Sequence, residues 1–188
     1  MKKSIVDLVL VLLIIGCNSI LGLAQVPIDN EGKDFWIAWT YTFYNEAEVI
    51  IQSGSTANVT MSGSVLWTGI VLPGKPAIIT LPESSKLGKK ENIENKGIHI
   101  MSDTDISVIF RTPDGEGRES DDAYLAIPTS GLGKEYYVMS YNPVRIGLGS
   151  NASFFAIVAV EDNTNVYFGM TNILLDRGET FQKISGTD

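Results

Sequence analysis

The feature that most constrains this chain is a succession of short apolar runs rich in β-branched and aromatic residues. Gly, Pro, Ser and Asn separate the runs, for example at 53–55, 73–74 and 147–150. Runs of this composition, bounded by turn residues, are typical of strands. The predicted strands are 35–42, 48–52, 58–61, 66–72, 77–81, 97–101, 106–111, 123–127, 136–140, 154–160 and 166–170. They predict an all-β fold of antiparallel sheets, arranged like a β-sandwich or a barrel.

Helices are not expected. No segment keeps an apolar period of 3.6 residues over several turns. The best helix candidate, residues 84–95, has no apolar face, so we expect a loop there.

An internal repeat constrains the architecture further. Residues 58–60, 71–75 and 78–81 resemble residues 165–167, 174–179 and 181–184, since each set reads as a strand, a strand ending in a Gly turn, and another strand. This predicts two related β units. The first continues through strands near 97 and 106, and the second lacks these counterparts, so we expect domain 25–188 to be incomplete at its C-terminal end, with unpaired strand edges. The alternative is that any two β-meanders share so loose a pattern.

The first 24 residues have the composition of a signal peptide. Lys2 and Lys3 precede the apolar run 8–15, and small residues stand at the −3 and −1 positions before Gln25. The run is too short to span a membrane, which takes about 20 apolar residues. We therefore expect residues 1–24 to be removed and the mature chain to be secreted, with no transmembrane segment.

Cys17 supplies an alternative for the N-terminus. Residues 14–17 resemble a bacterial lipobox, in which Cys17 would be lipidated and would anchor the chain to a membrane. Cys17 is the single cysteine, so cleavage after Ala24 leaves a chain without thiols. A disulfide framework and thiol catalysis are then excluded.

The net charge and the single histidine limit which partners and which catalytic chemistry are expected for this chain. The net charge of −8 argues against nucleic acid, which requires a basic face, and otherwise favours solubility. His99 is the single histidine and lies between Ile98 and Ile100 in a predicted strand, so its side chain should point away from the face that they share. No G-x-S-x-G motif accompanies it, and a structural role is expected. We expect no cofactor and no metal site of the His/Cys type.

An acidic loop is the one candidate ion site. Calcium prefers carboxylate oxygens, but Glu116 and Arg118 break the EF-hand order, and the alternative is a solvated loop. The candidate ligands are Asp114, Glu116, Glu119, Asp121 and Asp122.

Three exposed-site candidates remain. Asn58-Val-Thr and Asn151-Ala-Ser are glycosylation sequons, which matter in a eukaryotic secretory pathway. In strand 35–42, Trp36 lies on the opposite face from Phe35 and Trp39. It either packs in the core or marks a contact surface for a protein or a glycan.

Four motifs carry a resemblance to a known family. They are G-K-D-F at 32–35, D-x-Y-L-A-I-P at 122–128, G-x-E-Y-Y-V-x-S-Y at 133–141 and F-A-I-V-A-x-E-D-N-T at 155–164. The chain resembles the N-terminal domain of the IgGFc-binding protein family, a set of secreted all-β extracellular modules. The resemblance implies a non-enzymatic binding or adhesion module with an extracellular protein or glycan as ligand. It transfers no binding residues. We also expect Gly131 and Gly133 to adopt backbone angles that favour glycine.

Two other function classes stay open. A bacterial surface lipoprotein with a structural role would be lipidated at Cys17. A secreted carbohydrate-active β-sandwich enzyme would need paired carboxylates across a cleft. Glu161 and Asp162 are adjacent in a turn, point in different directions and do not supply that pair.

Overall fold

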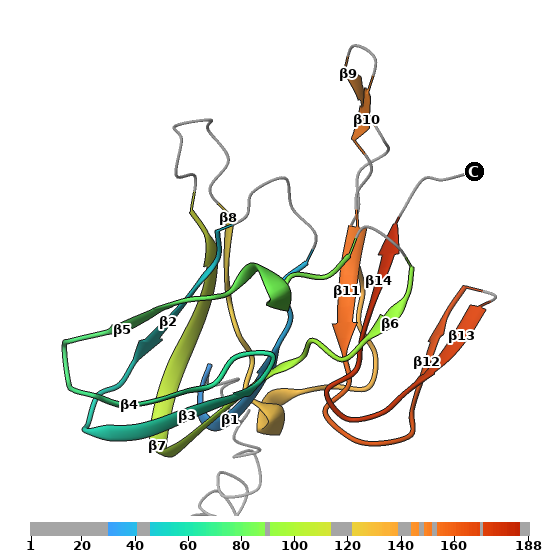
Figure 1. Ribbon diagram of the computed structural model, residues 1–188. Helices are drawn as coiled ribbons and strands as arrows, with labels where there is room; N and C mark the ends of the chain where they lie inside the picture. The colour runs from blue at the N-terminus through green and yellow to red at the C-terminus, as the bar shows by residue number, and fades with distance from the viewer. Residues whose placement is uncertain are drawn as a thin grey trace, which may run out of the picture.

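The computed structural model describes residues 30–40, 46–88, 91–113, 122–138, 144–146, 149–151, 154–169 and 171–184. The side chains of 144–146, 149–151, 171–172 and 182–184 are not described. In these ranges every sheet is antiparallel and the helical elements are the short 3₁₀ turns η1 (Glu83–Ser85) and η2 (Thr129–Gly131), which confirms the all-β prediction (Figure 1). The strands are β1 (Glu31–Ile37), β2 (Glu48–Gln52), β3 (Ala57–Gly63), β4 (Trp67–Val71), β5 (Ala77–Thr80), β6 (Ile93–Glu94), β7 (Ile98–Thr112), β8 (Asp122–Leu125), β9 (Val144–Ile146), β10 (Gly149–Asn151), β11 (Phe154–Val158), β12 (Thr164–Phe168), β13 (Thr171–Leu175) and β14 (Thr180–Ile184).

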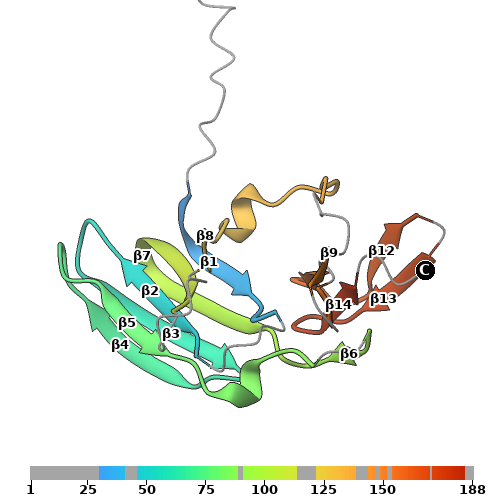
Figure 2. The ribbon, with the colours of Figure 1, turned by 90° about the horizontal axis from the view of Figure 1, so that it is seen from above.

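The 15-residue strand β7 organises the large sheet. Its His99 is opposite both Trp36 of β1 and Ser62 of β3, and its Arg111 is opposite both Glu48 of β2 and Ala123 of β8. Strands β1 and β8 therefore share one edge of β7, and β3 and β2 share the other. With β4 and β5 at its two ends, the sheet curls into a nearly closed barrel (Figure 2).

Alternation along the strands fills the barrel. In β3, for example, Ala57, Val59 and Met61 are buried while Asn58 and Thr60 are exposed. Period-2 alternation in a half-buried sheet produces this arrangement. The core consists of Phe35, Ile37, Trp39, Ala47, Val49, Ile51, Ala57, Val59, Met61, Val65, Val71, Ile79, Leu81, Ile98, Ile100, Ile106, Val108, Phe110 and Ala126.

The repeat seen in the sequence appears as two long, bent hairpins. In the first hairpin, β2 pairs with β5 and β3 pairs with β4. In the second hairpin, β11 pairs with β14 and β12 pairs with β13. Each hairpin bends at a four-residue turn whose third residue is a glycine with positive φ, Gly74 (68°) in the first and Gly178 (81°) in the second. A glycine there avoids the clash of a Cβ in the left-handed region. The two related β units thus have the same strand pairing.

Several local expectations were wrong. The strands expected at 97–101 and 106–111 are one continuous strand, because β7 is paired along almost its whole length. Of the strand expected at 136–140, the described residues 136–138 form no strand, although they are apolar, since no described strand pairs with them. Gly131 and Gly133 do not have positive φ, and a Cβ on Gly133 would contact nothing closer than 3.8 Å. The loop expected at 84–95 holds apart from the end of η1 and the two-residue strand β6.

Candidate functional sites

Trp36 lies in a stack that joins the large sheet to the second hairpin. Its ring is parallel to that of His99, with centroids 4.3 Å apart and an interplanar angle of 6°. The guanidinium of Arg177, at the bend of the second hairpin, lies 5.5 Å from the Trp36 ring centroid. A cation over an aromatic face is attracted by the electron density of the ring. The Trp36 side chain is half-buried and makes both of these ring contacts, and its role as a contact surface stays a prediction.

His99 lies within hydrogen-bond distance of a carboxylate. Its Nε2 is 3.0 Å from the Oδ2 of Asp34, which lies on the neighbouring strand β1. His99 is buried together with Ile98 and Ile100. Its side chain nonetheless occupies the opposite face of β7 from theirs and stacks on Trp36, so it is buried by the junction rather than by the barrel core. The structural role expected for this histidine is consistent with that position.

The E-D-N-T motif forms an interlocked bend. Asp162 accepts a hydrogen bond from the backbone N–H of Arg177 at 2.9 Å, and Asp176 accepts one from the N–H of Asn163 at 3.2 Å. Thr164 donates from its hydroxyl to the carbonyl of Glu161 at 2.7 Å. The acidic side chains therefore satisfy backbone donors of the two turns.

Two of the family-like motifs meet at Pro128. A Cβ on Gly32 would lie 2.5 Å from the Cβ of Pro128, so only glycine fits there. Upstream of this proline, Tyr124 stacks on Phe110 with centroids 5.0 Å apart and donates from its hydroxyl to the carbonyl of Ala38 at 3.3 Å. Part of the ring is exposed, but the hydroxyl is enclosed, and its burial raises the pKa of Tyr124. The D-x-Y-L-A-I-P motif is thus a packing motif.

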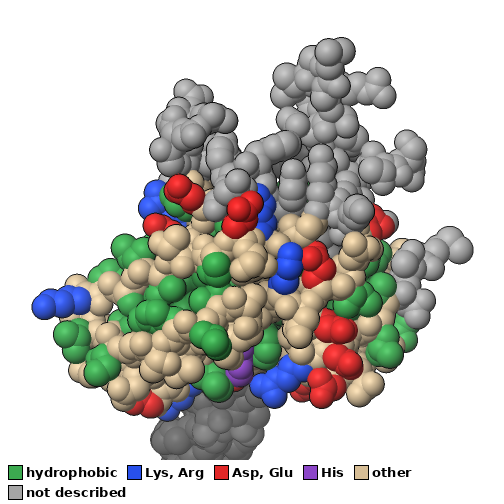
Figure 3. Space-filling model, viewed as in Figure 1, with side chains coloured by type: hydrophobic (Ala, Val, Ile, Leu, Met, Phe, Trp, Pro, Cys, Tyr) green, Lys and Arg blue, Asp and Glu red, His purple; other side chains and the backbone are tan. Residues whose placement is uncertain are grey.

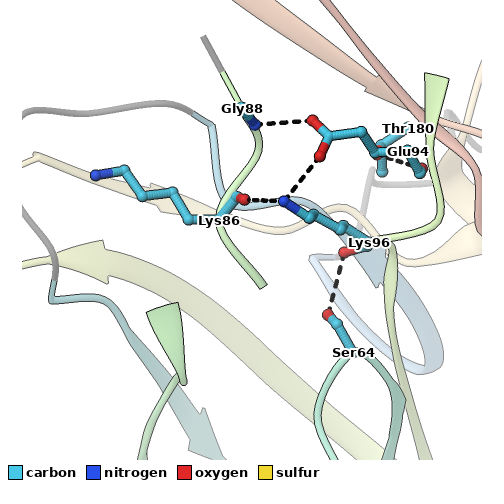
Figure 4. Close-up of polar contacts among 6 residues, drawn as sticks. All are labelled: Ser64, Lys86, Gly88, Glu94, Lys96 and Thr180. Carbon is cyan, nitrogen blue, oxygen red and sulfur yellow. Dashed lines mark hydrogen bonds and ion pairs between the residues drawn. The ribbon is translucent and has the colours of Figure 1, made fainter. Parts of the chain in front are cut away.

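A polar network fastens the segment before β7 to both hairpins (Figure 4). Glu94 accepts from the N–H of Gly88 at 2.7 Å and pairs with Lys96, whose Nζ is 2.8 Å from Oε2. Lys96 also donates to the carbonyl of Lys86 at 2.6 Å. The hydroxyl of Thr180 in the second hairpin donates to the Glu94 carbonyl at 2.7 Å, and that of Ser64 in the first donates to the Lys96 carbonyl at 3.3 Å. The contacts of Thr180 and Ser64 join residues that are 86 and 32 positions apart, so no local sequence pattern indicates them.

Asn58 is exposed on β3, as a glycosylation site requires, but its amide is engaged. Both its side-chain and its backbone nitrogens donate to the carboxylate of Asp103, the backbone contact at 2.8 Å. These hydrogen bonds, that of the side chain above all, lower the pKa of Asp103. Asn151 is the last residue of β10, and its side chain is outside the described residues. Both sequons stay predictions.

The structure does not describe most of the acidic loop that was predicted as an ion site. Asp114, Glu116, Glu119 and Asp121 lie outside the described residues, and Asp122 is an exposed residue at the start of β8. Among the residues that the structure does describe, no group of three or more metal-binding side chains occurs. Residues 1–24 and Cys17 also lie outside the described ranges. No helix within those ranges is long and apolar enough to cross a membrane.

An apolar row crosses the outer face of the large sheet, and sequence reasoning did not identify it. Ile78 of β5 is opposite Ile50 of β2, Ile50 is opposite Ile109 of β7, and Ile109 is opposite Leu125 of β8. Directly opposed residues of antiparallel strands project on the same face. Ile78 and Leu125 are 60% and 43% exposed, and the two middle residues are half-buried. We call these four residues the outer row.

Hydrophobic side chains also gather near the outer row. Figure 3 shows them on the left-hand part of the molecule, where Figure 1 places β4 and β5. Ile70 of β4 and Leu72, which follows that strand, are also exposed, at 64% and 43%. The sequence contained a signal for this surface, because apolar residues occur on both faces of β2 and β5. The order of the strands in the sheet is what aligns these residues into a row.

A family model described as IgGFc binding protein matches residues 122–186. None of the curated proteins and none of the solved structures matches the chain. The matched segment includes β8, the whole second hairpin and three of the four motifs that carried the resemblance, and the motif at 32–35 lies outside it. The predicted resemblance to this family is thereby confirmed over residues 122–186.

Proposed function

We propose that this chain is a secreted, non-enzymatic module that binds an extracellular protein through the outer row. The family whose model matches is non-catalytic. The observation that carries the proposal is the outer row itself, in which four aliphatic side chains from four strands lie side by side on the outside of the barrel. Contiguous exposed apolar surface is typical of protein-binding sites.

The residue types favour a protein over a glycan as the ligand. Aliphatic side chains gain by excluding water, and about 25 cal/mol is gained for each Å² of apolar surface buried. A glycan platform instead needs an open aromatic ring with polar groups around it. Trp36, the candidate for such a platform, has its ring occupied by His99 and Arg177. At the rim of the outer row, Glu48 and Arg111 form an ion pair at 3.9 Å, which suits a polar border.

The immunoglobulin Fc region is the first ligand to test, because the description of the matched family names it. Purified IgG Fc fragment would be immobilised and the 188-residue chain passed over it in a surface plasmon resonance experiment. Ile78→Lys places a charge in the outer row at a residue that is already 60% exposed, so folding should be retained. If binding buries the Ile78 side chain, its replacement removes about 1.5–3 kcal/mol of binding free energy. The expected loss of affinity is about 10- to 100-fold.

The matched control is Thr68→Lys, which adds the same charge to an exposed position of β4 outside the outer row. This control should bind like the wild type. If Ile78→Lys leaves binding unchanged, the outer row is not the binding surface. If the wild-type chain does not bind Fc at about 100 μM, the Fc region is not its ligand.

The proposal also includes export of the chain from the cell. Secretion leaves Gln25 as the mature N-terminus and lipoprotein processing leaves lipidated Cys17, which a mass spectrum of the mature chain distinguishes.

A further inference from the structure

The two hairpins differ in what covers their edges. In the first hairpin, the outer edge of the β2–β3 strand is occupied by β7, with β3 opposite residues 98–102 and β2 opposite residues 107–111. The corresponding strand of the second hairpin consists of β11 and β12. Strand β11 pairs with β14 and β12 pairs with β13, and no other described strand pairs with either of them. The position that β7 fills in the first hairpin is therefore open in the second, as far as the described residues extend.

The inner faces differ in the same way. Val59 and Met61 of the first hairpin are 0% and 1% exposed, because they pack with β7 inside the barrel. Their counterparts in the second hairpin, Val166 and Phe168, are only half-buried. The small cluster around them contains the buried residues Ala159, Leu175 and Phe181. The second hairpin thus has both an open strand edge and an incompletely covered apolar face on the strand that corresponds to β2–β3.

We propose that the β11–β12 edge is a strand-accepting site, which binds an extended polypeptide segment as an added antiparallel strand. The first hairpin defines the chemistry of the segment, since β7 places Ile106, Val108 and Phe110 inward at alternate positions. Main-chain hydrogen bonds to an open edge give affinity, and the apolar side chains at alternate positions select the segment. This site is separate from the outer row and does not depend on the function proposed above.

The added strand is a segment of another protein, since the β7 of a second copy is not available to supply it. In each copy β7 is the only described strand with this pairing, and its two edges are already occupied by β1 and β8 and by β3 and β2. Lending β7 to a neighbour would remove the centre of its own barrel. A different polypeptide with the same alternation meets no such cost.

The test uses the 188-residue chain and a synthetic peptide with the sequence of β7, residues 98–112. Amide hydrogen exchange is measured by mass spectrometry with and without the peptide. We expect at least a tenfold slowing of exchange in β11 and β12, because their outward N–H groups gain partners. The exchange of β4 and β5, which end the large sheet, should not change. A control peptide carries Ile106→Lys and Val108→Lys and should have no effect.

Two protein variants make the test specific. Val166→Lys places a charge on the inner face of β12 and should abolish the effect of the peptide. Tyr167→Lys, at a position 75% exposed on the same strand, should preserve it. If Val166→Lys unfolds the hairpin, the proposal is tested instead by comparing the β7 peptide with the control peptide on the wild-type chain. Unchanged exchange in β11 and β12 overturns the proposal, as does protection confined to β4 and β5, or a dimer of the chain that shields β11 and β12 without peptide.

Discussion

Gly97→Ala tests whether the start of β7 in the large sheet and the second hairpin are joined by direct backbone contact. Gly97 precedes β7, and its N–H donates to the carbonyl of Gly178 at the second bend, with a nitrogen–oxygen distance of 3.0 Å. A Cβ on Gly97 would lie 2.6 Å from that same oxygen and 3.0 Å from a methyl group of Val158. Both neighbours belong to the second hairpin, so the methyl group would push this hairpin away from the barrel.

The size of the effect follows from these distances. An ordinary contact begins at 3.4 Å, so the oxygen must move by about 0.8 Å (3.4 minus 2.6). Overpacking of this kind costs about 1–3 kcal/mol, and loss of the hydrogen bond adds about 1 kcal/mol. The lower conformational entropy of alanine in the unfolded chain offsets about 0.4–1 kcal/mol. We therefore expect a net destabilisation of about 1–3 kcal/mol.

Thermal unfolding followed by circular dichroism measures this loss. For a domain of this length each kcal/mol lowers Tm by about 2–4 °C, so Gly97→Ala should melt about 2–12 °C below the wild type. Gly54→Ala is the matched control, because a Cβ on Gly54 would meet no heavy atom within 4 Å and the residue has no positive φ. Its Tm should equal or slightly exceed that of the wild type. A Gly97→Ala variant with the same Tm as the wild type would show that Gly97 and the second hairpin are not in contact.

Two further predictions concern single contacts. A double-mutant cycle of Trp36→Leu and Arg177→Gln, measured by urea denaturation, should give a coupling free energy of about 0.5–1 kcal/mol, and a value near zero would show that the guanidinium does not pack on the ring. The hydrogen bonds from Asn58 lower the pKa of Asp103 in the folded state, so their contribution to stability is complete above the ordinary aspartate pKa of about 3.9 and is lost as the pH falls through the lowered value. Asp103→Asn should therefore have a Tm that falls less than that of the wild type between pH 5 and pH 2, and parallel Tm profiles would contradict the assignment.

The strands of the first hairpin were predicted closely, because their signal is local. Strand β2 has the predicted bounds, and β3, β4 and β5 differ by one or two residues at their ends. Alternation also predicted that Phe35 and Trp39 lie on the opposite face from Trp36, and both are buried while Trp36 is half-buried. The aromatic strand was predicted less well. Strand β1 begins at Glu31 rather than at Phe35, since its first residues pair with the far part of β7.

The candidate sites were predicted less well than the strands, because their roles depend on distant partners. Trp36 of β1 contacts Arg177, which lies in the second hairpin and is far from it in the sequence. The outer row depends on the order β5, β2, β7, β8, which no local pattern contains. The glycine expectation at Gly133 was wrong for the same reason, since a turn signal alone does not determine whether φ is positive.

The sequence by itself determined the all-β class, the in-and-out alternation of each strand and the duplication of the hairpin. These properties are local, because a side chain in a strand projects to one face or the other and a Gly turn reverses or bends the chain wherever it occurs. The tertiary structure alone decided that β7 runs through the centre of the barrel and divides its two edges among four strands. It also decided that the same hairpin is fully covered in one unit and open along β11 and β12 in the other, as far as the described residues extend. Strand pairing joins residues that are far apart in the sequence, and its hydrogen bonds are made by the backbone, which is the same for every residue except proline.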